Sequence, residues 1–160
     1  SPVEPQTGPK NGFLAEFYMN DLPGIGDNYW IRSYKNDTLR IKPTEFAITY
    51  EAGFFQNTNT DGLMLIRPLR QSISPFLFLN GEKVTVEVMS ISKENYSFLS
   101  ALQTQSTNGG IFAVPLENLP TNIQNKNPNG KKALGQFIIS KVSRFSAVID
   151  KDKALPMEKL

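Results

Sequence analysis

Acidic side chains are the residues of this sequence with the clearest potential for chemistry. A glycosidase holds two carboxyl groups about 5 to 10 Å apart across a cleft, so a pair of this kind would make the chain a carbohydrate-active hydrolase. The sequence fixes no distance between its carboxylates. We therefore favour solvated charges and keep the hydrolase as an alternative. The candidates are Glu16, Asp21, Asp27, Asp61 and Glu87.

Histidine and cysteine are both absent from the 160 residues. Standard zinc sites need these ligands and are excluded. The serine–histidine and cysteine–histidine nucleophile systems are excluded for the same reason. A general base would have to be an acidic or lysine side chain with a shifted pKa. We therefore predict that the protein is not an enzyme.

Two short motifs have the outline of a ligand-binding loop and lack its decisive residues. Residues 57–62 (Asn-Thr-Asn-Thr-Asp-Gly) have the spacing that opens a calcium loop. The twelfth position, which should be a bidentate glutamate, is Pro68. Residues 24–26 (Gly-Ile-Gly) lack the third glycine and the following helix of a dinucleotide site. We therefore predict neither a metal nor a cofactor.

Aromatic side chains offer two candidate contact surfaces. Tyr29 and Trp30 could stack on a sugar. Neighbours on a strand point to opposite faces, so packing in the sheet is the favoured interpretation for this pair. Phe54 and Phe55 cannot both point inward from an extended strand, and we keep an exposed partner contact there as a hypothesis.

Asparagines are concentrated between Asn118 and Asn129, inside a long predicted loop over residues 111–135. Their amides, Asn122 and Asn125 among them, could hold a glycan or peptide ligand. Turn formation explains the same composition and is the favoured interpretation. A loop of this length is nevertheless typical of a functional segment.

Charge and hydropathy exclude two further classes of partner. The formal net charge is +2, with 17 basic and 15 acidic residues, and the basic residues are scattered, so nucleic acid is not indicated. No apolar run approaches the roughly 20 residues that a transmembrane helix requires.

Alternating apolar residues predict about six strands, the clearest having Val84, Val86 and Val88 on one face. One helix is expected near residues 93–106, because Ser92 is a suitable N-cap. The fold class is therefore mainly β, and we expect an antiparallel β-sandwich of immunoglobulin or fibronectin type with this one helix inserted before the last strand. The expected strands cover 13–19, 29–34, 63–69, 76–79, 84–89 and a long or broken terminal strand over 137–149. Residues 39–52 are ambiguous, and a strand is possible there because Phe46, Ile48 and Tyr50 alternate.

The domain organisation follows from composition. Residues 1–12 hold three prolines and two glycines and are expected to form an extended lead-in or linker. Residues 13–150 are expected to form a single domain, and residues 151–160 a charged tail.

One stretch resembles a known family. Residues 81–99, which read Gly-Glu-Lys-Val-Thr-Val-Glu-Val-Met-Ser-Ile-Ser-Lys-Glu-Asn-Tyr-Ser-Phe-Leu, resemble the block "G-D-x-V-x-V-x-L-x-S-I-S-K-x-x-Y-x-F/Y-L" of the domain of unknown function 4249 family. Residues 112–115, 120–123 and 133–137 resemble later pieces of that family, in its order. Family members are longer, with a lipobox signal and an N-terminal β domain. This chain therefore resembles their C-terminal part, or a short paralogue.

The resemblance implies a location and a role. Members of the family are lipoproteins of Bacteroidetes at the outer membrane, often encoded near a TonB-dependent transporter. We therefore expect a non-catalytic binding or interaction domain of a cell-envelope lipoprotein, accessory to TonB-dependent nutrient uptake. The carboxylate hydrolase and a purely structural spacer module are the alternatives.

Overall fold

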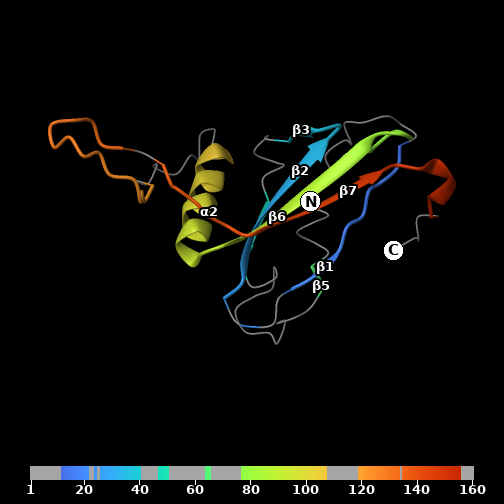
Figure 1. The fold of residues 1–160 in the computed structure, drawn as a ribbon, viewed down its shortest axis with the longest axis horizontal. Coiled ribbons are helices and arrows are strands. Elements are labelled where there is room, and N and C mark those ends of the chain that lie inside the picture. The colour runs from blue at the N-terminus through green and yellow to red at the C-terminus, as the bar shows by residue number, and fades with distance from the viewer. Residues whose placement is uncertain are drawn as a thin grey trace.

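The computed structural model describes residues 12–21, 24, 26–40, 47–50, 64–65, 77–107, 119–133 and 135–155. Within these ranges the chain forms short and long strands, one α-helix and a single turn of 3-10 helix (Figure 1). In chain order the elements are β1 (Met19–Asn20), β2 (Asn28–Lys35), β3 (Thr38–Leu39), β4 (Ala47–Tyr50), β5 (Met64–Leu65), β6 (Lys83–Ile91), α2 (Lys93–Thr107), β7 (Val142–Val148) and η3 (Lys151–Lys153).

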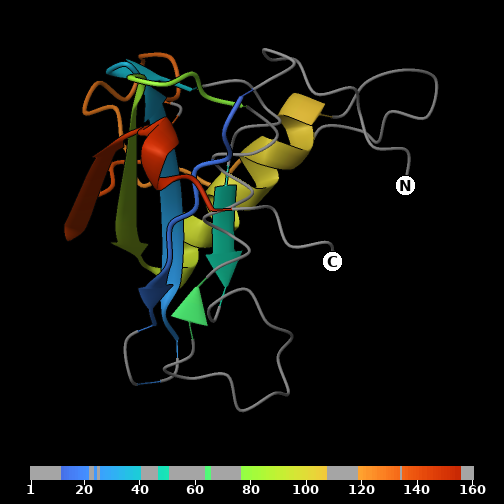
Figure 2. The ribbon, with the colours of Figure 1, turned by 90° about the vertical axis from the view of Figure 1, so that its right-hand side faces the viewer.

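The principal sheet has five antiparallel strands. Its order is β3-β2-β6-β7, and β4 pairs with the first half of β2 on the same side as β3. β1 and β5 form a separate two-stranded pair. Figures 1 and 2 show α2 beside one end of the principal sheet, and its residues contact β4 and β2. The mainly β, antiparallel architecture with one helix ahead of the last strand is confirmed.

The longest pairing joins β2 to β6. Their register runs without interruption from Asn28 opposite Ile91 to Lys35 opposite Val84. β-branched valines alternate along β6 and favour this extended conformation. Because β6 also pairs with β7, it is a central strand, and its residues from Val84 to Met89 are all buried.

A two-residue turn joins β2 to β3. Asn36 and Asp37 have φ angles of 47° and 64°, in the left-handed region that such hairpin turns require. Asparagine and aspartate adopt this region more readily than other non-glycine residues. The Asn36 side chain also accepts a hydrogen bond from the Lys83 backbone N–H at 2.8 Å, which ties the turn to the start of β6.

One face of the sheet carries the larger core. The odd-numbered residues of β2 and the even-numbered residues of β6 point to this face, where the segment leading to β1 covers them. Phe17, Met19 and Ile149 pack at its margin. Its buried members are Ala15, Tyr29, Ile31, Ala47, Phe78, Val84, Val86 and Val88.

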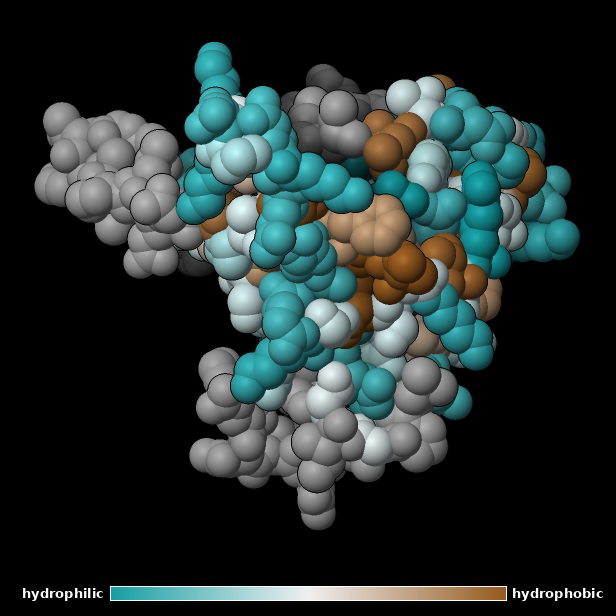
Figure 3. All heavy atoms as spheres, turned by 60° about the vertical axis from the view of Figure 1, so that its left-hand side comes forward, coloured by the Kyte–Doolittle hydropathy of each residue, from teal (hydrophilic) through white to brown (hydrophobic). Residues whose placement is uncertain are grey.

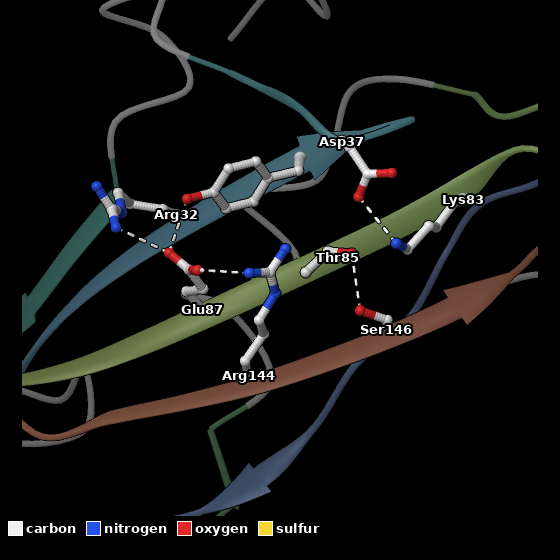
Figure 4. A network of polar contacts seen from close by, with 8 residues as sticks. Arg32, Asp37, Lys83, Thr85, Glu87, Arg144 and Ser146 are labelled. Atoms are coloured by element: carbon white, nitrogen blue, oxygen red, sulfur yellow. Dashed lines mark hydrogen bonds and ion pairs between the residues drawn. The ribbon is translucent and has the colours of Figure 1, made fainter.

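Among the described elements, α2 lies over the opposite face and covers one end of it. Phe98 and Leu99 of the helix pack on Met89 and Ile91 of β6, with Trp30 at the edge of the cluster. Beyond the reach of the helix, this face of β2, β6 and β7 carries polar side chains (Figure 4).

The helix begins where its cap predicts. Ser92 Oγ accepts a hydrogen bond from the Asn95 backbone N–H at 3.2 Å, so it caps the first turn. Ile91 and Tyr96, one residue before and four after this cap, belong to the same apolar cluster, as a hydrophobic staple requires. The helix ends at Thr107, one residue beyond the prediction.

Three predicted strands differ from the structure. The described residues of the strand predicted over 76–79 form no strand, since Phe78 has only an isolated bridge to Phe13. Residues 14–18 are irregular, with only Phe13 in an isolated bridge to Phe78, although Ala15 does point into the core. The terminal strand begins at Val142, because both backbone groups of Phe137 bond to the side chain of Asn122 instead of a strand. Ile139 is 81% exposed and lies outside the core.

The described strands form one open sheet with β1 and β5 as a separate pair. A closed sandwich is therefore not established by these residues. The first residues of the predicted tail form η3, capped by the Asp150 side chain. Among the helices in the described ranges, none is both long and apolar enough to cross a membrane.

Candidate functional site

A row of polar side chains crosses the uncovered face of the sheet. The strand register places Arg32 of β2, Glu87 of β6 and Arg144 of β7 side by side. Arg32 Nη2 lies 2.8 Å from Glu87 Oε2, and Arg144 Nη1 lies 3.5 Å from Glu87 Oε1. Tyr34 Oη donates a third interaction, a 2.8 Å hydrogen bond to Glu87 Oε2. Figure 4 shows these side chains converging on the carboxylate from both neighbouring strands.

The surroundings of Glu87 hold it in the ionised form. Burial by itself would raise the pKa of the carboxyl group, whose side chain is only 10% exposed. The hydrogen bonds from Tyr34 and Arg32 and the charges of Arg32 and Arg144 outweigh this effect and lower the pKa below its ordinary value. A carboxylate held ionised in this way is a poor proton donor near neutral pH.

Tyr34 is correspondingly held protonated. Burial and then the hydrogen bond to Glu87 raise the pKa of its phenol above the ordinary value. The guanidinium of Arg144 lies 5.5 Å from the centre of the Tyr34 ring, and that of Arg32 lies 5.3 Å from the centre of the Trp30 ring. Each arginine therefore has both an anionic and an aromatic contact, and such contacts order long side chains on an open face.

The remaining candidate carboxylates do not gather around Glu87. Asp21 is buried and accepts a 2.7 Å hydrogen bond from Tyr29 Oη. Tyr29 and Arg32 stand on opposite faces of β2, because they are three residues apart. Asp21 and Glu87 are therefore held on opposite sides of the sheet. Glu16 is exposed, Asp27 is half-buried and Asp61 lies outside the described residues.

The aromatic candidates have separate surroundings. Tyr29 is buried in the larger core, so its ring is not open to a ligand. Trp30 is half-buried and packs against the cluster beneath α2. Phe54 and Phe55 lie outside the described residues.

The two asparagine candidates both hold backbone in place. Asn122 donates from Nδ2 to the Phe137 carbonyl at 2.8 Å, and its Oδ1 accepts from the Phe137 N–H at 2.7 Å. Asn125 donates to the Lys131 carbonyl at 2.9 Å and accepts from the Asn127 N–H at 2.9 Å. The Asn122 side chain imitates the pairing of a strand, whereas the oxygen of Asn125 closes a local turn. We call the described residues between 119 and 141 the asparagine arm.

Packing anchors the base of the asparagine arm to the body of the domain. Leu119 and Ile138 pack on the apolar cluster beneath α2. Gln136 donates a 2.9 Å hydrogen bond to the buried Asn95 of the helix. Figure 1 shows the arm extending beyond α2, away from the sheet. The helix and the arm are thus joined at the base, while the tip projects.

Large apolar side chains are exposed on this arm. Ile123 is 40% exposed, Phe137 66% and Ile139 81%. In Figure 3, where the left-hand side of Figure 1 comes forward, hydrophobic side chains gather on this face among hydrophilic ones. Residues 119–133 also include Lys126, Lys131 and Lys132 and no acidic residue. The arm is therefore both apolar and cationic.

The comparison with protein families gives one match. A family model described as "Domain of unknown function (DUF4249)" matches residues 4–146, which is most of the chain. The chain belongs to the DUF4249 family. No curated protein matches the sequence, and no solved structure matches it. The DUF4249 match covers both the polar row and the asparagine arm.

Sequence reasoning missed several residues of this DUF4249 domain. Arg32 and Arg144 were not singled out as site residues, although side chains alternate between the two faces along each of their strands. That alternation is the signal that places them together on the outer face. Phe137 was assigned to a strand, and the sequence has no pattern that shows Asn122 bonding to its backbone. In the described residues, no cluster of three or more potential ligands could hold a metal ion.

Proposed function

We propose that this chain is a non-catalytic binding domain of a cell-envelope lipoprotein, accessory to a TonB-dependent outer-membrane transporter. The envelope location and the transporter are expectations that come with the family resemblance of the sequence. The immunoglobulin-like sandwich stays part of this proposal. The observation that carries a binding role is the asparagine arm, which presents Phe137 and Ile139 to solvent on a fixed backbone.

The arm suits a protein partner better than a glycan. A sugar site needs free amide donors and acceptors. Here the amides of Asn122 and Asn125 are already bonded to the backbone of the arm. Exposed apolar side chains grouped on one surface are typical of protein contacts. Since the arm is ordered before binding, little conformational entropy is lost on association.

The positive charge of the arm favours an acidic protein as the partner. Lys126, Lys131 and Lys132 surround the tip without any acidic residue between 119 and 133. An acidic, partly apolar loop of a transporter would be complementary to this surface. A peptide with the same chemistry would also fit.

The alternative functions have less support. A carboxylate hydrolase needs one group that donates a proton, whereas Glu87 is held ionised by two arginines and Asp21 is held across the sheet. A purely structural spacer module does not require an ordered arm with exposed apolar residues. Phe54 and Phe55 remain a predicted contact of the same binding role.

The test uses the lipidated full-length protein in the envelope of the bacterium that produces it. After crosslinking and affinity isolation, quantitative mass spectrometry measures the recovery of TonB-dependent transporters. We expect enrichment of one transporter, and its loss in a Phe137→Ser/Ile139→Ser variant. Leu155→Ser is the matched control, because Leu155 is 89% exposed and lies outside the arm. Absence of any transporter, or recovery that the arm variant leaves unchanged, would overturn the proposal.

A further inference from the structure

In the described part of the chain, the outer edge of β7 is unpaired along its whole length. β7 pairs with β6 on one side, and no other described strand pairs with it. All seven of its residues are exposed, including Val142, Phe145 and Val148. Sheet edges are normally protected by several charges, a proline or a bulge. β7 contains one charged residue, Arg144, and no proline or glycine.

Backbone hydrogen bonds at the two ends of β7 fix which of its backbone groups point outward. The Ile149 N–H bonds to the Glu82 carbonyl and the Lys141 carbonyl accepts from the Ser90 N–H, so these odd-numbered residues face β6. Backbone direction alternates along an antiparallel strand. The N–H and C=O groups of the even-numbered residues therefore point away from the sheet: Val142, Arg144, Ser146 and Val148.

We propose that this edge pairs with the same edge of a second copy of the chain, in an antiparallel, two-fold symmetric β7–β7 contact centred on Phe145. In that register Val142 lies opposite Val148 of the second copy, and Arg144 lies opposite Ser146. The backbone of Val142 is then hydrogen-bonded to that of Val148 in the second copy, and the backbone of Arg144 to that of Ser146. Each of these pairs occurs twice because of the two-fold symmetry. The two five-stranded sheets become continuous across the contact.

The sequence of β7 is more self-complementary in this register than with the axis moved by one residue in either direction. A two-fold axis at Arg144 would place two guanidinium groups directly opposite each other, which is destabilising. An axis at Ser146 would place Val142 opposite Asp150 and separate the aromatic rings. With the axis at Phe145, the two rings meet in a non-hydrogen-bonded pair, where opposed side chains are closest. The arginine is partly neutralised within its own chain, because Arg144 lies 3.5 Å from Glu87.

Cysteine crosslinking tests the register directly, because the chain has no cysteine of its own. In the proposed contact the two Cα atoms at position 145 are about 4.5 Å apart. That separation lies within the range that a disulfide spans. Phe145→Cys should therefore form a covalent dimer on mild oxidation. Ser143→Cys is the control, since its two copies would be about 14 Å apart and cannot be joined.

Charge substitution at Ser146 tests the same register without a crosslink. The contact contains two symmetry-related pairs of Arg144 and Ser146. Ser146→Glu places a carboxylate opposite the arginine in both pairs, whereas Ser146→Lys places an ammonium group there. Both variants lose the hydroxyl contact with Thr85 equally. We expect the dimer dissociation constant, from sedimentation equilibrium, to be at least about tenfold lower for the glutamate variant.

Three outcomes would overturn the inference. The first is a purified chain that stays monomeric up to about 1 mM; this is also the result expected if the edge pairs with a different protein or with another strand of a longer chain. The second is equal crosslinking of the Phe145→Cys and Ser143→Cys variants. The third is a lysine variant that dimerises as well as the glutamate variant. None of these measurements involves a transporter, so the inference and the proposed function fail independently.

Discussion

Tyr34 on β2 and Glu87 on β6 are joined by a 2.8 Å hydrogen bond across the open face of the sheet. The same carboxylate is 2.8 Å from Arg32. One acidic side chain therefore satisfies donors from two positions of the neighbouring strand, and its removal should affect both. Stability measurements on the purified chain can separate this contribution from that of ordinary surface ion pairs.

Replacing Glu87 with glutamine should lower the free energy of unfolding by about 1 to 3 kcal/mol, because two arginines lose their anion in a largely buried position. Urea denaturation at neutral pH measures the change. Asp37→Asn is the control, since it breaks an exposed ion pair with Lys83 and should lower the urea midpoint much less. Equal effects of the two substitutions would contradict a special role for the polar row.

Protonation of Glu87 should contribute to the pH dependence of the free energy of unfolding. Its pKa in the folded chain is below the ordinary value of 4.5. The unfolded state therefore binds the proton more readily than the folded state. The contribution of ionised Glu87 to the free energy of unfolding is thus complete above the ordinary pKa, and it is lost as the pH falls through the lowered pKa.

We expect the wild-type free energy of unfolding to fall between about pH 5 and pH 3, and to fall less steeply in Glu87→Gln. Some slope should remain in the variant, because the pKa values of Asp37, Glu82 and Glu94 are also lowered. Urea titrations at a series of pH values measure both slopes. Parallel curves for the two proteins would show that Glu87 does not contribute.

Replacing Tyr29 with phenylalanine should lower the free energy of unfolding by about 1 to 3 kcal/mol. The substitution keeps the buried ring and removes the hydroxyl that donates to the buried Asp21. Thermal and urea denaturation both report the change. Tyr18→Phe is the matched control, because Tyr18 is exposed and its hydroxyl should contribute little. A stable Tyr29→Phe variant would mean that another donor replaces the hydroxyl.

Replacing Asn122 with alanine should loosen the asparagine arm without unfolding the sheet. The Phe137 N–H loses its acceptor, so its amide hydrogen exchange should accelerate strongly, while amides in β2 and β6 keep their protection. Nuclear magnetic resonance resolves the individual amides. Asn127→Ala is the control, because Asn127 accepts only a local bond from Asn129 at the tip. Unchanged exchange at Phe137 would contradict the pairing described above.

The parts of the fold that local chemistry determines were predictable. The valine alternation of β6 and the cap at Ser92 depend on neighbours in sequence, and the structure has both. The helix bounds came within one residue for the same reason.

The parts that depend on distant partners were not predictable. Phe137 and Ile139 alternate as a buried strand would, yet the side chain of Asn122 takes the backbone groups that a strand needs. Glu87 received attention as a possible catalyst, but its neighbours Arg32 and Arg144 come from strands far away in the sequence. Only the register reveals that one carboxylate lies between two guanidinium groups.

The position of β7 also has a consequence during synthesis. β6 is the most buried strand, and its second neighbour arrives only after the chain has passed through α2 and the asparagine arm. Closing such a long connection is slow compared with forming the β2–β3 hairpin. Until Val142 to Val148 emerge from the ribosome and dock, the valine-rich β6 is an unprotected edge. A nascent chain that pauses in the arm is therefore the form most exposed to aggregation and to capture by chaperones.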